Sequence, residues 1–103
     1  MSPIDFNGLD TAVHGPMRLG VMTALQIEKE LDFTTLKKRL RATDGSLGMH
    51  LAKLEESKYI ASKKDFVGRR PKTTYRLTTA GRKALTKYLE SMRQLLDEVE
   101  RAR

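Results

Sequence analysis

The apolar residues of this 103-residue chain recur every three or four positions in four stretches and alternate in one. The first stretch predicts a helix over about 16–29, because proline suits the first helical position. The inner face of this helix carries Met17, Val21 and Leu25. Gly20 lies inside the helix, where it lowers helix stability by about 1 kcal/mol relative to alanine, and is expected to allow close packing.

Two shorter helices follow, and each begins with a side chain that caps helices well. Asp32 precedes the second helix, whose inner face carries Phe33, Leu36 and Leu40. Thr43 precedes the third helix, predicted over about 43–58, whose inner face carries Leu47, Leu51 and Leu54. Only Arg41 and Ala42 separate the two helical patterns before Thr43, so the pair forms a helix-turn-helix.

The pattern after Tyr59 changes to that of a β-hairpin over about 60–77. Residues 60–67 predict the first strand, and residues 73–77, rich in β-branched and aromatic side chains, predict the returning strand. Residues 68–72 between them predict a turn with three cations, Arg69, Arg70 and Lys72. Gly68 and Pro71 limit the freedom of this turn, which reduces the entropy lost when its arginines bind a partner.

Thr78 is the expected cap of a last helix over about 79–101. The apolar stripe of this helix includes Leu85, Tyr88, Leu89, Met92, Leu95, Leu96 and Val99. Several members are seven positions apart, a coiled-coil spacing that covers only about two heptads. A helix of this length extends beyond a small core, so we predict that these seven residues form a dimer interface. The alternative is a helix packed wholly on its own domain.

The chain is expected to be one domain, with an N-terminal arm (1–13), a winged body (14–79) and the C-terminal helix. The arm contains Ile4, Phe6, Leu9 and Val13, and either folds back or packs on a partner subunit. Asp10 is suited to cap a single helical turn within it. For His14, just before the first helix, a local backbone hydrogen bond is favoured over a metal or catalytic role.

The net charge of +7 is concentrated in one part of the chain. Residues 33–83 hold fourteen basic and four acidic side chains, whereas residues 1–32 are acidic and residues 84–103 are neutral. A localised basic field favours a polyanionic partner over a merely solvated surface. Cysteine is absent, and neither a membrane-spanning run nor a signal-peptide pattern is present, so we expect a cytoplasmic protein without a thiolate metal site or cofactor.

The third helix has an outer face suited to reading a groove. This face carries short polar groups, a flexible apolar group and a cation, and its candidate contact residues are Thr43, Ser46, Met49, His50 and Lys53. The candidate contacts to phosphates from the second helix are Lys37, Lys38 and Arg41. Those from the hairpin are Lys63, Lys64, Arg69, Arg70 and Lys72. Taken alone, each cluster also fits a solvated charged surface.

The chain resembles the winged helix-turn-helix transcription regulators of the MarR/ArsR type over about residues 14–90. The residues that carry the resemblance are His14-x-Pro16-x-Arg18, Phe33-x-x-Leu36, Thr43-Asp44-Gly45-x-Leu47-x-x-His50-Leu51-x-x-Leu54-Glu55, Gly68-Arg69-Arg70-Pro71 and Leu77-Thr78-x-x-Gly81-Arg82. The resemblance implies a mainly α fold with a small β-hairpin (α+β), and long N- and C-terminal helices that form a dimer interface. It also implies a third helix in the major groove and a basic wing along the backbone or minor groove. Lys58 departs from the group, in which a glycine often ends the recognition helix.

The leading hypothesis is a sequence-specific transcription regulator, a repressor that binds double-stranded DNA as a homodimer on a pseudo-palindromic operator. The alternatives are a winged-helix protein–protein interaction module and a non-specific nucleic-acid-binding protein. An enzyme is disfavoured, because the two histidines are isolated and no phosphate-binding glycine loop is present. Whether a small-molecule effector binds the protein is an open question. Tyr88, Met92 and Phe6 are candidates to line a cleft for it, although packing at an interface is the simpler role for all three.

Overall fold

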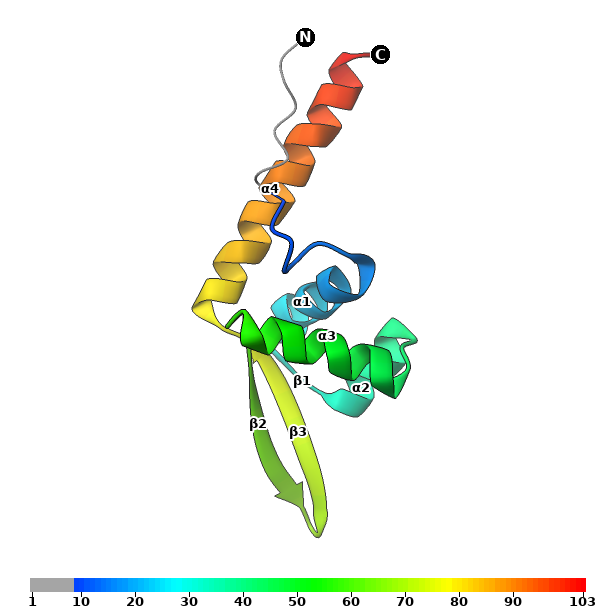
Figure 1. Cartoon of the computed structure of the whole chain (residues 1–103), viewed down its shortest axis with the longest axis vertical. Helices are drawn as coiled ribbons and strands as arrows, with labels where there is room; N and C mark the ends of the chain where they lie inside the picture. Colours follow the sequence, from blue (N-terminus) through cyan, green and yellow to red (C-terminus); the bar gives the residue numbers. More distant parts are fainter. Residues whose placement is uncertain (1–8) are drawn as a thin grey trace.

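The computed structural model describes residues 9–103 and contains four helices and three strands within that range. In chain order they are α1 (Pro16–Glu28), β1 (Glu30–Asp32), α2 (Phe33–Leu40), α3 (Asp44–Glu56), β2 (Ile60–Val67), β3 (Arg70–Leu77) and α4 (Thr79–Arg101). The helices α1 to α3 form a small body, from which the β2–β3 hairpin projects on one side and α4 on the other (Figure 1). The result is an elongated molecule of 60 × 25 × 21 Å. The α+β winged-helix class expected from the sequence is confirmed.

The core lies where the three body helices meet the base of the hairpin and the first half of α4. It contains Leu36 of α2 and the three predicted inner-face leucines of α3, whereas Leu40 of α2 is half-buried against it, and Val13 joins it from before α1. Its buried members are Val13, Val21, Met22, Leu25, Leu36, Leu47, Leu51, Leu54, Ile60, Tyr75, Leu77, Leu85 and Tyr88. No polar or charged side chain of residues 9–103 is buried, so apolar burial stabilises this core without interior ion pairs.

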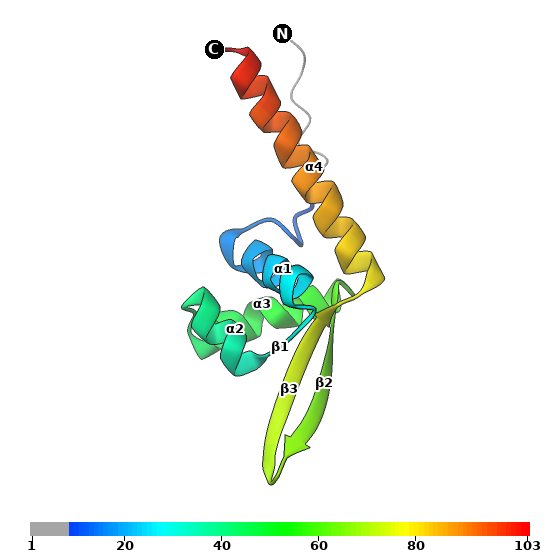
Figure 2. The same ribbon diagram turned by 180° about the vertical axis from the view of Figure 1, so that it is seen from behind.

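The sheet has a third strand that the sequence pattern did not predict. β1 pairs antiparallel with β3, and the strand order is β1-β3-β2. Figure 2, the view from behind, shows β1 beside the base of the hairpin. Glu30, Leu31 and Asp32 pair with Arg76, Tyr75 and Thr74, respectively. A three-residue strand has no alternation to recognise, and it exists only because β3 offers a free edge.

The three predicted N-caps are confirmed by their hydrogen bonds. The Asp32 carboxylate accepts from the Thr35 N–H at 2.8 Å, and the Thr43 hydroxyl accepts from the Ser46 N–H at 3.2 Å. The Thr78 hydroxyl accepts from the Gly81 N–H at 3.0 Å. Each cap satisfies one backbone donor that a helix leaves without an intrahelical partner.

A basic residue with a positive φ follows each of the three body helices, directly after α1 and α2 and two residues after the last residue of α3. Lys29 has φ 69°, Arg41 has φ 50° and Lys58 has φ 64°. A positive charge at a helix C-terminus is favourable, whereas the left-handed backbone destabilises a side chain with a Cβ by about 1–2 kcal/mol. Lys58, in the turn after α3, thus has a backbone conformation that glycine would adopt without this cost. Separately, α1 ends at Glu28, one residue before its predicted end.

The hairpin has the predicted bounds, but its turn is shorter than predicted. Val67 pairs with Arg70, so the turn consists of Gly68 and Arg69 alone, and Arg70 to Lys72 belong to β3. Gly68 has φ 65°, which matches the type II′ turn with glycine at its first central position. The prediction of a five-residue turn was wrong because the cations and Pro71 suggested a loop, although they fit a strand that is unpaired on its outer side.

The chain before α1 forms a single turn rather than a long N-terminal helix within residues 9–15. The Asp10 carboxylate accepts from the Ala12 N–H at 2.8 Å, which confirms the predicted cap. Within residues 9–103, the His14 side chain makes no hydrogen bond to a nearby backbone group. Its Nδ1 lies 2.8 Å from the Tyr88 hydroxyl of α4, which corrects the sequence expectation. Ile4 and Phe6 lie outside the described residues.

The first turn of α4 crosses the chain at Tyr59 with no room for a side chain. A Cβ added to Gly81 would lie 2.0 Å from the Tyr59 carbonyl oxygen. Gly20 also permits close packing, as expected, because a Cβ there would lie 2.8 Å from a methyl of Leu40. Gly81 faces rigid backbone, whereas Gly20 faces the end of a flexible side chain, so only Gly81 is sterically required.

Candidate nucleic-acid interface

The rotation of α3 about its axis is fixed by its buried leucines, which determines the face it exposes. Leu47, Leu51 and Leu54 are at most 2% exposed. Met49 on the other side is 54% exposed, Thr43 and Lys53 are exposed, and Ser46 and His50 are half-buried. The five residues predicted for base reading therefore lie on or at the border of the outer face.

His50 is held by a residue that was absent from the predicted contact set. The Arg18 Nε of α1 donates to His50 Nδ1 at 3.1 Å. Because Nδ1 accepts this bond, the ring proton of neutral His50 is on Nε2. Arg18 and His50 are 32 positions apart, so no helical spacing indicated the pair, although Arg18 belongs to the motif at the first helix.

The cations of α2 differ in what they contact. Lys37 Nζ lies 2.9 Å from the Asp44 carboxylate in the first turn of α3, so this ion pair joins the two helices of the helix-turn-helix. Lys38 and Arg41 are exposed at the C-terminal end of α2. Of the three predicted phosphate contacts, these two have the side chains best placed to reach an outside partner.

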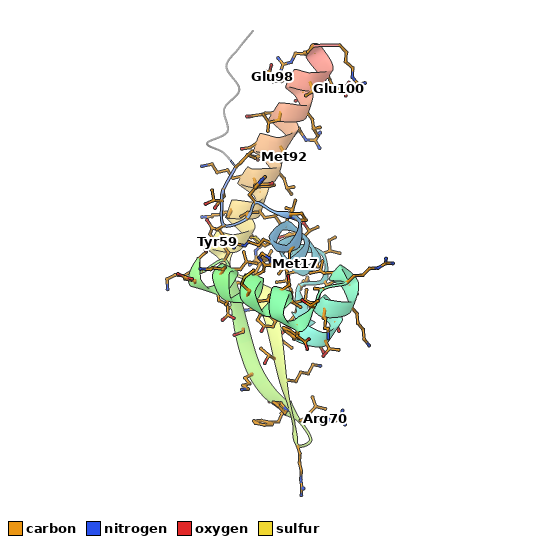
Figure 3. All side chains as sticks on the ribbon, turned by 45° about the vertical axis from the view of Figure 1, so that its right-hand side comes forward. Met17, Tyr59, Arg70, Met92, Glu98 and Glu100 are labelled. Carbon is orange, nitrogen blue, oxygen red and sulfur yellow. The ribbon has the colours of Figure 1, made fainter. Side chains whose placement is uncertain are left out.

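The β2–β3 hairpin carries six basic side chains. Lys64, Arg69 and Arg70 are exposed, and Figure 3 shows Arg70 at the far end of the hairpin. Lys63 lies 3.9 Å from Asp65, and Lys72 lies 3.8 Å from Asp32. The Asp32 pKa is lowered, first by its hydrogen bond from Thr35 and also by the charge of Lys72. The same carboxylate thus caps α2 and steadies the hairpin.

The helix α3 itself has a net negative charge, although the net charge of residues 33–83 as a whole is positive. Its ionisable side chains besides His50 are Asp44, Lys53, Glu55 and Glu56. Lys53 lies 3.8 Å from Glu56. The positive field around α3 therefore comes from α2 and the hairpin. Glu55 and Glu56 lie in the last turn of α3, whereas Ser46 and Met49 lie in its N-terminal half.

The predicted dimer residues of α4 divide into two groups. Leu85 and Tyr88 are each 2% exposed and belong to the core of their own chain, so we remove them from the predicted interface. Leu89, Leu96 and Val99 are 49%, 62% and 58% exposed, and Met92 and Leu95 are half-buried. A shallow, mostly apolar depression on α4 is lined by Thr86, Leu89, Glu90, Met92, Arg93 and Leu96. Tyr88, expected to line an effector cleft, is instead buried beside His14.

Comparison with known proteins identifies the family. Residues 17–96 match the family model described as a winged helix DNA-binding domain, and the chain belongs to this family. An uncharacterised protein of Methanocaldococcus jannaschii is 34% identical over 84 residues, which cover 82% of this chain and 91% of that protein. The expected resemblance to winged helix-turn-helix regulators is confirmed by this family match.

Solved structures of other proteins have the same fold. A transcriptional regulator homologue of Pyrococcus horikoshii has a TM-score of 0.79 and 27% identity, over 85% of this chain and 87% of that one. NadR, solved in complex with 4-hydroxyphenylacetate, has a TM-score of 0.71 and 22% identity, over 92% of this chain and 67% of that one. The second likeness concerns the fold alone.

Two further findings concern what residues 9–103 do not contain. None of their helices combines the length and the apolar character that a bilayer crossing requires. Nor do three or more histidine, aspartate or glutamate side chains in this range gather closely enough to hold a metal ion.

Proposed function

We propose that this protein is a sequence-specific DNA-binding transcription regulator, which acts as a repressor and binds a pseudo-palindromic operator as a homodimer. The observation that carries the proposal is the arrangement of charge around α3. Its outer face is exposed, with the basic end of α2 near one end and the basic hairpin leaving the other (Figure 1). A helix that enters a major groove needs this arrangement, because phosphates lie on both sides of the groove.

The acidic end of α3 is compatible with this mode of binding. Helix-turn-helix proteins contact base edges with the N-terminal part of the recognition helix. Ser46 and Met49 occupy that part, whereas Glu55 and Glu56 are at the other end. Affinity then comes mainly from Lys38, Arg41 and the hairpin cations, and sequence preference from the outer face of α3.

The dimer is proposed from the exposed apolar residues of α4. Leu89, Leu96 and Val99 follow helical spacing along a part of the helix that extends away from the body. Burying one such side chain stabilises an interface by about 1.5–3 kcal/mol. Leu96→Lys should therefore raise the dimer dissociation constant at least tenfold in sedimentation experiments. Gln94→Lys adds the same charge at an exposed polar position of α4 and should leave it nearly unchanged.

A protein–protein interaction module is the second candidate, and the acidic side chains of α3 favour it. Glu55 and Glu56 would repel phosphates but suit a basic protein surface. This reading predicts little DNA binding at physiological salt, whereas the regulator reading predicts binding that depends steeply on salt.

The deciding experiment is fluorescence anisotropy with two duplexes, one of random sequence and one from the region upstream of the protein's own gene. If a dimer contacts 6–10 phosphates, affinity should fall about 10³–10⁵-fold between 50 and 200 mM salt. Arg70→Ala should weaken binding to both duplexes equally, and Met49→Ala should change the ratio between them. No binding at 50 mM salt would refute the regulator, and binding without preference would refute sequence specificity.

A further inference from the structure

The hairpin tip exposes two apolar side chains with no support from the body. Phe66 is 66% exposed and Val67 is 63% exposed. Their cross-strand partners are Pro71 and Arg70, respectively. β1 pairs only with residues 74–76 of β3, so the outer part of the hairpin is two-stranded. An exposed phenylalanine at such a tip contributes little to folding and favours aggregation, so its presence indicates a binding partner that covers it.

The register assigns the two apolar residues to opposite faces. Side chains alternate along a strand, and residues paired across strands share a face. Phe66 and Pro71 therefore lie on the face that, nearer the body, carries the buried side chains of Ile60, Tyr75 and Leu77. Val67 lies on the other face. On this face the polar Lys64–Thr73 pair separates Phe66 and Pro71 from the core, so the two form an isolated apolar pair at the tip.

The charges around this pair define the chemistry of its partner. The two strands and their turn carry six cations, Lys63, Lys64, Arg69, Arg70, Lys72 and Arg76, and one anion, Asp65. A partner for this surface combines dense negative charge with an apolar surface that accepts an aromatic ring. Duplex DNA has both where a base step opens, since phosphates line the grooves and the faces of the bases are apolar.

We propose that Phe66 is an apolar wedge that enters the minor groove and partly unstacks a base step there, which bends the DNA. This inference rests on the DNA binding proposed above. The outer four residues of each strand extend about 13 Å beyond the third strand at about 3.3 Å per residue. The two strands lie about 4.8 Å apart, so with their side chains they are wider than a minor groove of about 6 Å. A single side chain enters instead, and wedges of this kind kink DNA by roughly 20–90°.

The experiment uses the full-length protein and the duplex from upstream of its own gene. Donor and acceptor dyes at the two ends report bending, and 2-aminopurine, placed in turn at each adenine, reports unstacking. We expect wild-type binding to shorten the end-to-end distance and brighten 2-aminopurine at one step. Phe66→Ser should abolish both signals and weaken binding about tenfold, as expected when burial of one large apolar side chain is lost. Phe66→Leu should restore most of the bend.

Three controls separate the wedge from charge and from folding. Val67→Ser removes an equally exposed apolar side chain from the other face and should bend DNA as the wild type does. Arg69→Ala removes one phosphate contact from each subunit of the dimer and should lower the slope of log affinity against log salt by about two, whereas Phe66→Ser should leave that slope unchanged. Because Phe66 is exposed, the thermal midpoint of Phe66→Ser should equal that of the wild type.

The outcomes distinguish the wedge from the function on which it rests. If the wild type binds no duplex, the proposed DNA binding and the wedge both fail. If the wild type binds, and Phe66→Ser bends DNA equally, only the wedge fails. If Phe66→Ser leaves DNA binding unchanged but loses binding to vesicles containing phosphatidylglycerol, the tip contacts a lipid surface and the wedge is refuted.

Discussion

Gly81→Ala should destabilise the protein strongly, although alanine is the better helix former. The added Cβ would lie 2.0 Å from the Tyr59 oxygen and 2.8 Å from its carbonyl carbon, whereas real Cβ atoms keep at least 3.0 Å. The first turn of α4 must therefore move outward by about 1 Å, a strain of the size that overpacked cores show. This movement stretches two bonds of Thr78, from its N–H to Tyr59 at 3.0 Å and from its hydroxyl to the Lys58 oxygen at 2.6 Å.

The magnitude follows from these contacts. Overpacking destabilises by about 1–3 kcal/mol, and each weakened hydrogen bond by about 0.5–1.5 kcal/mol. The helix propensity of alanine offsets about 1 kcal/mol. The net loss is about 3 kcal/mol, which for a domain of this size lowers the thermal midpoint by about 12–24 °C.

Gly48→Ala is the matched control, because it is the same substitution inside another helix. A Cβ at Gly48 would meet nothing within 4 Å, so only the propensity gain of about 1 kcal/mol remains. Both variants should be measured by thermal and urea unfolding at one protein concentration, since a dimer makes the midpoint concentration-dependent. If Gly81→Ala lies within 1 kcal/mol of the wild type, the argument from close approach is wrong.

Three further changes test local features. Lys58→Gly should stabilise the protein by about 1 kcal/mol in urea unfolding because φ is 64°, whereas Lys58→Ala should not; equal effects would contradict the argument from the left-handed backbone. Asp32→Asn keeps a capping side chain but removes the carboxylate whose pKa is lowered. In the wild type, the ionised Asp32 stabilises the folded state above about pH 4, and this stabilisation is lost as pH falls through the lowered pKa. The free energy of unfolding of Asp32→Asn should therefore depend less on pH in the acid range than that of the wild type. The same pH dependence in both proteins would refute this. Tyr59 has a raised pKa, first because its hydroxyl donates to Asp10, so the stability of the wild type should fall as pH rises above about 10. Tyr59→Phe should be less stable than the wild type at pH 7 but should lose less stability at alkaline pH. Parallel curves of stability against pH for the two proteins would count against this cause.

The helices of the body could be predicted because their signals are local. The spacing of Leu47, Leu51 and Leu54 determines which side of α3 faces the core, and Thr43 determines where the helix begins. Both are properties of a few neighbouring residues. The exposed face of α3, and hence the candidate base-reading residues on it, follows from the same spacing.

Contacts between distant segments could not be predicted in this way. β1 is a strand only because β3 presents an edge to it, and the Arg18–His50 bond joins residues of two helices. Leu85 and Tyr88 show a different limit. Their coiled-coil spacing is the same whether they face their own core or a second chain, and only the path of α4 over the body decides between the two.

The junction at Tyr59 relates the proposed reading helix to the proposed dimer helix. Figure 3 shows Tyr59 where α3, the hairpin and α4 come together. Its backbone oxygen accepts from Thr78, its hydroxyl donates to Asp10, and Gly81 packs against its carbonyl. These contacts fix the angle between the end of α3 and the start of α4. In a twofold dimer built on α4, that angle sets the separation of the two α3 helices, which must match half-sites about 34 Å apart. Changes at this junction should therefore alter the preferred half-site spacing more than the affinity for one half-site.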